Sequence, residues 1–477
     1  MGFAAEKENT VAPFSGSLQL EKRRLGRSEL QVSPICFGSL RLTPENGIYK
    51  ETLYQALHSG IHFIDTSGAY GNGASEIVIG EALREFLAQY PQKKDSIVLC
   101  TKMGIVQGAT LQEMQMRSQM GHSMPGSYKL NDRTSYCLTP EYIESQLTLS
   151  LRRLQKEKVN LLLIQNPEHV IKIMKSKENF LAYLKRAFEH LEVEVAKGRI
   201  DHYGISSSAF LKKEIAPDFL DIDEIVGLAQ SISKNHHFSV VQTPFNLFET
   251  APLFQKNQKK RSFFEAALEH DLGMLTCRPL TSHHRDKVHH FITFPGKDEV
   301  SIKGKMHKVL MEVIELEKDL FKKMPEHREL KWGHLLRSNL NKISDWWKWN
   351  VYLQKQILPS MQTSIEKLPH SPEWNHWKVN YVNRMHSLFA LITDSLQGIA
   401  NLRTNQICHY LNQECASLED ETKLSNKVTR LYLSLPEIHS IVMGLSHPQH
   451  VTDLLELADI PEAETTVAIL KKVKMHF

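Results

Sequence analysis

Short apolar runs alternate with amphipathic helical windows between about residues 30 and 280, and this alternation restricts the fold more than any other feature of the sequence. The runs have the length and apolar content of buried strands. They are residues 33–38, 62–65, 97–102, 161–165, 202–206, 240–242 and 273–277. The windows between them, such as 75–86, 142–154 and 180–195, carry apolar residues at helical spacing. Repeated strand–helix units of this kind build a parallel sheet.

An eighth strand-like run, residues 440–444, follows only after a long gap in this pattern. Eight parallel strands with eight helices close into a barrel, so we predict an α/β fold, a (β/α)8 TIM barrel. The gap, residues 282–427, contains Lys- and Glu-rich helical windows and three tryptophans within residues 346–349. A loop of this length does not stay structureless in a compact protein. We therefore predict a helical insertion between the seventh and eighth strands, which forms its own packed lobe or is partly disordered.

The predicted chain has four parts. Residues 1–21 form a flexible N-terminal segment, 22–281 the first part of the barrel, 282–427 the helical insertion, and 428–477 the last strand with a C-terminal helix. Residues 103–138, rich in Gln, Met, Gly and Ser, are predicted to form a mobile loop after the third strand. The tryptophans of the insertion are more typical of its core than of a partner-binding surface, and both interpretations stay open.

The composition is that of a folded soluble protein. Hydrophobic residues make up 41% and charged residues 23% of the 477 residues, which excludes a disordered, collagenous or fibrous chain. There are 58 lysine and arginine residues against 54 aspartate and glutamate residues, and the net charge of +4 requires neither a nucleic acid nor an anionic membrane as partner. The six cysteines include no CxxC pair, which favours a reducing compartment. The sequence also has no signal pattern and no apolar stretch of about 20 residues, so we predict a cytoplasmic protein that spans no membrane.

Three polar residues lie at or just after the ends of the second and third predicted strands. Asp65 ends the second strand, Tyr70 follows it in a glycine-rich loop, and Lys102 ends the third. Because the carboxyl ends of barrel strands meet at one edge, the three side chains can converge. A lysine beside a phenol lowers the pKa of the tyrosine from about 10, and a carboxylate holds that lysine in place. Singly, an ion pair and a packed aromatic are the simpler interpretation; together they predict a proton donor for carbonyl reduction by a nicotinamide cofactor.

Several motifs occur in a specific order along the first part of the chain. They are Arg24-Leu25-Gly26, Cys36-Phe37-Gly38, FIDTSGAYG at 63–71, Ser75-Glu76, Ile79-Gly80 and Thr101-Lys102. In this order they resemble the opening half of the aldo-keto reductase family, and the resemblance covers roughly residues 22–280 and 428–458. It implies a barrel that binds a nicotinamide dinucleotide without a Rossmann domain, and the chain has no GxGxxG fingerprint. It also implies that Asp65, Tyr70 and Lys102 are three of the family's four catalytic residues.

The fourth catalytic position departs from the family's pattern. Where the family usually has His-x-Pro after the fourth strand, this chain has Gln165-Asn166-Pro167. A glutamine amide can donate a hydrogen bond to a carbonyl oxygen, but it cannot become a cation or relay a proton. Loss of an oxyanion donor costs about 10²- to 10³-fold in rate. Because Gln165 can still donate one hydrogen bond, we predict a smaller loss of rate. The family's potassium-channel β-subunit branch also has an amide here, and a buried amide satisfied by backbone groups is an equal alternative.

Segments after the later strands are similar to the family's cofactor-binding segments. Ser206-Ser207 and Gln242 match residues that hold the nicotinamide carboxamide, and Arg278 has the fork geometry that suits phosphate oxygens. Residues 443–451 resemble the strand-to-helix segment that receives the adenosine phosphate. By this resemblance the cofactor site consists of Ser206, Ser207, Gln242, Arg278, Leu280, Gly444, Ser446 and His450. The family favours NADP, and NAD is possible because the usual phosphate-binding cations are missing.

The 24 histidines raise the question of a metal site, above all the pairs His283-His284 and His289-His290. No cysteine or carboxylate lies at dependable ligand spacing beside them, so we predict a solvated loop and no metal. The sequence therefore predicts an NAD(P)-dependent oxidoreductase that reduces an aldehyde or ketone, or oxidises the alcohol in reverse. The alternative is a catalytically impaired regulator that binds the cofactor and, through the insertion, a protein partner or a second copy of the chain.

Overall fold

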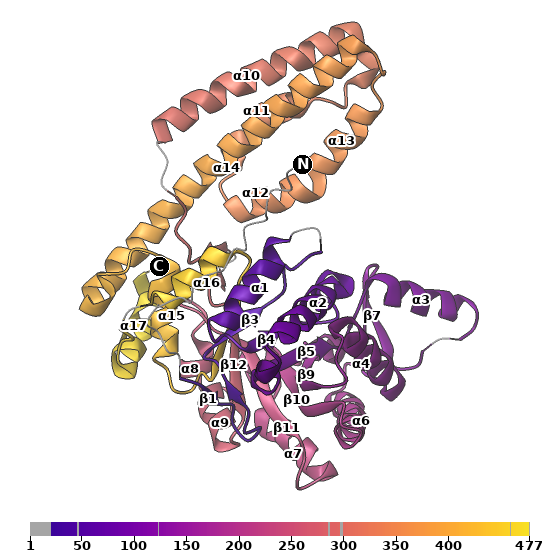
Figure 1. Ribbon diagram of the computed structural model, residues 1–477, viewed down its shortest axis with the longest axis vertical. Coiled ribbons are helices and arrows are strands. Elements are labelled where there is room, and N and C mark those ends of the chain that lie inside the picture. The colour runs from indigo at the N-terminus through magenta and orange to yellow at the C-terminus, as the bar shows by residue number, and fades with distance from the viewer. Residues whose placement is uncertain are drawn as a thin grey trace, which may run out of the picture. The chain divides into compact units, whose positions relative to one another are not determined.

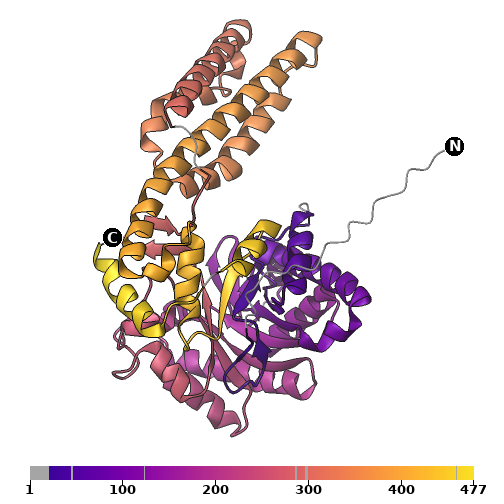
Figure 2. The same cartoon turned by 60° about the vertical axis from the view of Figure 1, so that its left-hand side comes forward.

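Figures 1 and 2 show the computed structural model of the chain, which describes residues 21–44, 47–122, 124–284, 287–295, 299–457 and 459–476. The chain divides into two structural units. The first consists of the residues up to 285 together with 426–477, and the second consists of residues 286–425. The predicted flexible segment, residues 1–21, lies outside the described residues except for its last position.

Eight parallel strands form a closed barrel in the first unit, which confirms the predicted fold. In their order around the barrel they are β3 (Ile35–Gly38), β4 (Phe63–Asp65), β5 (Val98–Met103), β9 (Val159–Gln165), β10 (Ile200–Ser206), β11 (Phe238–Pro244), β12 (Gly273–Cys277) and β15 (Ser440–Gly444). Strand β15 pairs with both β12 and β3 and so closes the sheet, although the second unit separates it from β12 in sequence.

Helices surround the barrel (Figure 1). They are α1 (Ile48–His58), α2 (Ala74–Gln89), α4 (Pro140–Leu154), α5 (Glu168–Met174), α6 (Lys177–Ala196), α7 (Ile222–Ile232), α8 (Ala251–Phe254), α9 (Phe263–Glu269), α15 (Leu424–Leu433), α16 (Pro448–Leu455) and α17 (Ala463–His476). Short 3-10 turns join some of them, namely η1 (Tyr70–Gly73), η2 (Pro91–Ser96) and η3 (Ala209–Leu211). A small hairpin of β1 (Arg23–Arg24) and β2 (Gln31–Val32), which the sequence did not predict, precedes β3.

The register of the strands collects polar residues at one end of the barrel. Strands β3, β4, β5 and β11 are buried at every position, which explains their continuous apolar runs. Gly204 allows β10 to approach β11 closely, because a Cβ there would lie 1.9 Å from the backbone oxygen of Val240. Near the carboxyl ends, Ser206 lies beside both Gln165 and Gln242. The residues that end the strands therefore face one common region.

The segment 103–138 is folded, and the prediction that it forms a loop was wrong. It contains β6 (Ile105–Val106), α3 (Gly108–Gln119), β7 (Ser127–Asn131) and β8 (Thr134–Cys137). The three strands pair antiparallel in the order β6-β8-β7, and Val106 and Cys137 belong to a small apolar cluster with Leu111 of α3. The strands are 2, 5 and 4 residues long, too short for alternation to reveal them in the sequence.

The second unit has its own apolar core. Its helices are α10 (Glu299–Lys323), α11 (Trp332–Asn339), α12 (Trp346–Tyr352), α13 (Leu358–Glu366) and α14 (Pro372–Glu414), joined by η4 (Pro325–His327), η5 (Leu340–Lys342) and the π-turn η6 (Leu353–Ile357), and followed by η7 (Ala416–Leu418). Two short strands, β13 (Thr281–His284) and β14 (Lys287–His290), precede these helices, so the predicted insertion is not helical from its first residue. Trp349 is buried in the core beside Phe389, whereas Trp346 and Trp347 are partly exposed. None of the described helices is long and apolar enough to cross a membrane.

Two histidines near the amino ends of barrel strands link stability to pH. The pKa of His236 and that of His439 are lowered to about 4, mainly by burial and secondly by Arg27 and Arg23 respectively. His236 is 3% exposed, and its Nε2 lies 3.0 Å from Nη1 of Arg27. The Nδ1 of His439 accepts a hydrogen bond of 3.0 Å from the backbone nitrogen of Met274. Protonation therefore places a charge in a buried site at His236 and in a partly buried site at His439, and in both rings it removes an acceptor, because Arg27 can only donate to His236.

We expect the free energy of unfolding to fall as the pH drops from about 6.5 toward 4. Below about 6.5 the unfolded chain takes up protons on these two histidines, whereas the folded chain keeps them neutral to a pKa of about 4. Above pH 6.5 this loss of stability is therefore absent. At pH 5 each histidine lowers the free energy of unfolding by about 1–2 kcal/mol. Urea denaturation at pH 7 and pH 5 measures it. The variant His439→Gln keeps an acceptor for Met274 and should reduce the difference; equal stability of the unaltered chain at both pH values contradicts the prediction.

Candidate active site

A tight turn after β4 carries Tyr70 back toward the end of β5. Asp65 is the last residue of β4, and η1 begins at Tyr70. Gly71, Asn72 and Gly73 follow with φ of 58°, 56° and 92°, in the left-handed region that favours glycine. The φ of 92° at Gly73 is strained for any other residue, and a Cβ there would also displace the Arg153 side chain, whose Nε would lie 2.6 Å away, so the turn favours glycine.

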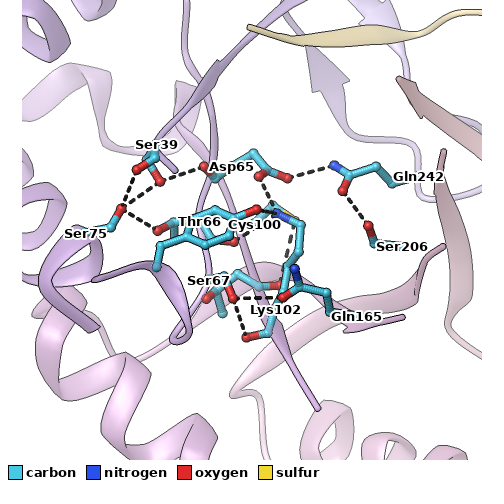
Figure 3. Close-up of polar contacts among 12 residues, drawn as sticks. Ser39, Asp65, Thr66, Ser67, Ser75, Cys100, Lys102, Gln165, Ser206 and Gln242 are labelled. Atoms are coloured by element: carbon cyan, nitrogen blue, oxygen red, sulfur yellow. Dashed lines mark hydrogen bonds and ion pairs between the residues drawn. The ribbon is translucent and has the colours of Figure 1, made fainter. Parts of the chain in front are cut away.

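Lys102 is the centre of a buried polar cluster at the carboxyl ends of β4 and β5 (Figure 3). Its ammonium donates to Oδ1 of Asp65, to the backbone oxygen of Thr66 at 3.0 Å and to the hydroxyl of Tyr70 at 3.4 Å. Asp65 and Lys102 are 2% and 3% exposed, so the two opposite charges are shielded from water and stabilise one another. The structure brings Asp65, Tyr70 and Lys102 together at the mouth of the barrel.

Burial decides the protonation state of this cluster. It raises the pKa of Tyr70 to about 12, and the Lys102 ammonium offsets only part of that rise. The expectation of a tyrosine pKa below its ordinary value is therefore wrong for the protein without ligands. Burial also lowers the pKa of Lys102, but the charge and hydrogen bond of Asp65, together with Tyr70 and Cys100, outweigh it, and the pKa lies above its usual range. At neutral pH a neutral phenol thus lies beside a charged ammonium, and a neutral phenol has a proton to donate.

Gln165, the last residue of β9, is held by a side chain. Its Oε1 accepts a hydrogen bond of 3.1 Å from the hydroxyl of Ser67, which lies two residues after Asp65. The amide nitrogen of Gln165 donates to no described residue. Backbone groups therefore do not satisfy this amide, and its nitrogen has hydrogen atoms to donate.

A second glutamine links the predicted cofactor residues to the ion pair. The Nε2 of Gln242 donates to Oδ2 of Asp65 at 2.8 Å, and its Oε1 accepts from the hydroxyl of Ser206 at 2.7 Å. Ser206 ends β10 and Gln242 lies within β11. Figure 3 shows the continuous sequence of contacts from Ser206 through Gln242 and Asp65 to Lys102. Four strands, β4, β5, β10 and β11, thus contribute to one hydrogen-bonded network around Asp65.

Ser207 is turned away from this network. Its buried hydroxyl donates to Oε2 of Glu168 at 2.7 Å and accepts from the backbone nitrogen of Ala209 at 2.9 Å. The other carboxylate oxygen of Glu168 accepts from Nδ2 of Asn166 at 3.1 Å. The proton of the Ser207 hydroxyl is therefore committed to Glu168, and only a lone pair is left for another ligand.

The remaining predicted cofactor residues follow β12 and β15. Arg278 pairs with Glu249 at 2.9 Å, and its φ of 57° places it in the left-handed region. Leu280 lies partly exposed in the turn after β12. Gly444 ends β15, and the backbone nitrogen of Ser446 donates to Nδ1 of His450, in α16, at 3.4 Å. Among the described residues, no group of three or more histidine, cysteine, aspartate or glutamate side chains is placed to hold a metal ion.

Sequence reasoning missed three side chains that hold predicted site residues, namely Ser67, Glu168 and Glu249. Ser67 and Glu168 lie two and three residues after strand-ending residues. Polar residues this close to the carboxyl end of a barrel strand are candidates for the mouth, so a signal existed. Nothing in the sequence pairs Glu249 with Arg278, because they follow different strands.

Comparison with known proteins establishes the family. The model of the aldo/keto reductase family matches residues 34–320, more than half of the chain. The chain therefore belongs to the aldo/keto reductase family. The match includes seven of the barrel strands, from β3 to β12, and ends before β15.

Several relatives are similar over part of their length. A 6-dehydroglucose reductase of Novosphingobium aromaticivorans is 28% identical over 200 residues, which are 41% of this chain and 53% of that protein. An NADH-specific methylglyoxal reductase of Escherichia coli is 28% identical over 138 residues, 29% of this chain and 35% of that protein. The chain thus spans about half or less of the length of these curated relatives. The glycerol dehydrogenase AKR11B4 of Gluconobacter oxydans superposes with a TM-score of 0.50 at 15% identity, over 96% of each chain, and supports the fold alone.

Proposed function

We propose that the chain is an NAD(P)-dependent oxidoreductase that reduces an aldehyde or a ketone, or oxidises the corresponding alcohol in reverse. One observation carries this proposal: the hydroxyl of Tyr70 lies 3.4 Å from the buried ammonium of Lys102, which Asp65 holds in place. Membership of the aldo/keto reductase family supports the same reaction class.

In the proposed reaction Tyr70 donates its proton to the carbonyl oxygen of the substrate. Lys102 stabilises the phenolate that remains, and Asp65 keeps the ammonium charged and oriented. The amide nitrogen of Gln165 donates a hydrogen bond to the same carbonyl oxygen, which favours the developing negative charge. A bound reduced nicotinamide would supply the hydride to the carbonyl carbon.

The residues at the strand ends suit the amide end of such a cofactor. Gln242 uses one amide hydrogen for Asp65, so a second hydrogen and the lone pairs of the Ser206 hydroxyl remain to bind a carboxamide. Ser207 offers only an acceptor, because Glu168 takes its proton. These buried groups have the mixed donor and acceptor character that a primary amide needs.

For the phosphate end we propose Arg278 with the segment around Leu280, and Gly444, Ser446 and His450 at the start of α16. Arg278 is partly exposed and pairs with Glu249, so binding a phosphate there requires exchange of one anion for another. His450 replaces a cation typical of 2′-phosphate binding, which leaves NADP and NAD both acceptable. We propose NADP as the preferred cofactor and NAD as the alternative.

The proposal is tested with the purified full-length chain. Calorimetric titration with NADPH and NADH should give saturable binding of at least one dinucleotide. The loss of reduced-nicotinamide absorbance should then accelerate on addition of a small aldehyde or ketone. Binding without turnover would favour the cofactor-binding regulator, and absence of binding by both dinucleotides would reject both functions. We also propose a reducing, cytoplasmic location, supported by the six cysteines, which form no disulfide bond within the described part of the chain.

Replacing Gln165 with histidine should raise the turnover number, by up to roughly 10-fold, because an imidazole can carry the positive charge that an amide cannot. Steady-state kinetics of Gln165→His at saturating cofactor measure the change. The matched variant Gln165→Leu removes the donor altogether and should be slower than the unaltered chain. A fall in turnover in Gln165→His would contradict the prediction and indicate a mouth adapted to the amide.

A further inference from the structure

We propose that Ser67 is a positioning residue that fixes the orientation of the Gln165 amide, so that its nitrogen and not its oxygen is presented to the substrate. The inference rests on the proposed function, since it assigns a role in the same reaction. The hydroxyl of Ser67 donates a hydrogen bond of 3.1 Å to Oε1 of Gln165. Figure 3 shows this oxygen directed at Ser67 and the nitrogen on the other side of the amide.

The amide of Gln165 needs a residue that fixes its orientation, because a glutamine side chain has two orientations of nearly equal shape. Rotation by half a turn about the last bond exchanges the oxygen and the nitrogen. Only the nitrogen can donate a hydrogen bond to a carbonyl oxygen, and the amide oxygen would repel it. A histidine in this place has a ring nitrogen that can carry a proton, whereas Gln165 depends on its surroundings to present the donor.

The bonding of Ser67 selects one of these orientations. Ser67 is 0% exposed, so its hydroxyl proton must find an acceptor within the protein. Its oxygen already accepts a hydrogen bond of 3.2 Å from the backbone nitrogen of Ala69. Two acceptors are in range of its proton, the Gln165 oxygen at 3.1 Å and the backbone oxygen of Lys102 at 3.5 Å. The nearer acceptor is available only when the amide oxygen faces Ser67.

The second glutamine of the site shows the same arrangement. Ser206 donates to Oε1 of Gln242 at 2.7 Å, and the nitrogen of that amide then faces Asp65. In both cases a buried serine donates a hydrogen bond to the oxygen of a glutamine amide, so the amide nitrogen points away from the serine. The two differ in what the nitrogen meets: the Gln242 nitrogen donates to Asp65, whereas the Gln165 nitrogen donates to no described residue. Gln165 is therefore the amide whose donor can serve a substrate oxygen.

The test is a cycle of variants in the full-length chain, with the turnover number and the dinucleotide dissociation constant as readouts. Ser67→Ala should lower turnover about 10-fold, part of the loss expected for a missing oxyanion donor, and leave dinucleotide affinity unchanged. Ser67→Thr, which keeps the hydroxyl, should restore most of the rate. On a Gln165→Leu background, Ser67→Ala should have no further effect, because no amide remains to be oriented. Ser75→Ala, which removes a buried hydroxyl that contacts Ser39 and Thr66, is the control and should keep the full rate.

A purely structural role for Ser67 predicts a different pattern, since loss of its contact with Ala69 would slow both backgrounds equally. Equal slowing, or an undiminished rate in Ser67→Ala, overturns the proposal. Failure of the proposed function has its own signature, because the unaltered chain would then show no carbonyl reduction that depends on Tyr70. Reduction that depends on Tyr70 but not on Ser67 overturns the positioning role alone.

Discussion

Replacing Tyr70 with phenylalanine should lower the rate of carbonyl reduction by roughly 10²- to 10⁴-fold, the contribution of a well-placed general acid. The substitution removes one oxygen and keeps the ring, so the turn of η1 and its packing should persist. The variant therefore lacks its proton donor. Lys102 is the other acid in the cluster, but Asp65 keeps its ammonium charged, so the lysine does not replace the tyrosine as donor. Single-turnover kinetics with bound cofactor measure the chemical step directly, without a contribution from product release.

A matched control comes from the same barrel. Tyr203, in β10, is fully buried, and its hydroxyl donates to Oε1 of Glu192 at 2.9 Å. Tyr203→Phe also removes one buried hydroxyl, and it should cost about 1 kcal/mol of stability with little change in rate. Dinucleotide affinity of Tyr70→Phe should stay close to that of the unaltered chain. Reduction by Tyr70→Phe at the original rate would show that another group donates the proton.

The barrel could be predicted from the sequence because its strands are buried on both faces. Buried parallel strands produce short apolar runs, and the run at 440–444 was visible even after the long gap. The segment 103–138 was missed for the opposite reason. Its strands β6, β7 and β8 are short and partly exposed, and their pairing depends on contacts that a local pattern does not contain.

For the candidate site, the sequence could indicate which residues end the strands, because the apolar runs give the limits of each strand. Residues at the carboxyl ends of parallel strands share one end of the barrel. It could not indicate how each side chain is bonded. Ser67 with Gln165, and Glu168 with Ser207, depend on side-chain rotamers that packing around the mouth decides. The protonation of Tyr70 was misjudged for a related reason: the sequence shows the neighbouring charge but not the depth of burial, which here has the larger effect.

Replacing Lys102 with methionine should abolish measurable reduction and lower the free energy of unfolding by about 3–5 kcal/mol, the cost of removing one partner of a buried ion pair. Methionine has nearly the length of the lysine stem, so no large cavity forms. Asp65, however, remains 2% exposed, with Gln242 as its remaining side-chain donor among the described residues. Chemical denaturation of the variant measures the loss, and single-turnover kinetics measure the rate.

A second substitution identifies the cause of that loss. In Lys102→Met the carboxylate of Asp65 is buried without the ammonium that pairs with it in the unaltered chain. Adding Asp65→Asn should recover much of the stability at pH 8, because a neutral amide replaces the unpaired charge, yet restore no activity. A double variant as unstable as Lys102→Met would mean that packing around the lysine stem, and not the Asp65 charge, sets the cost.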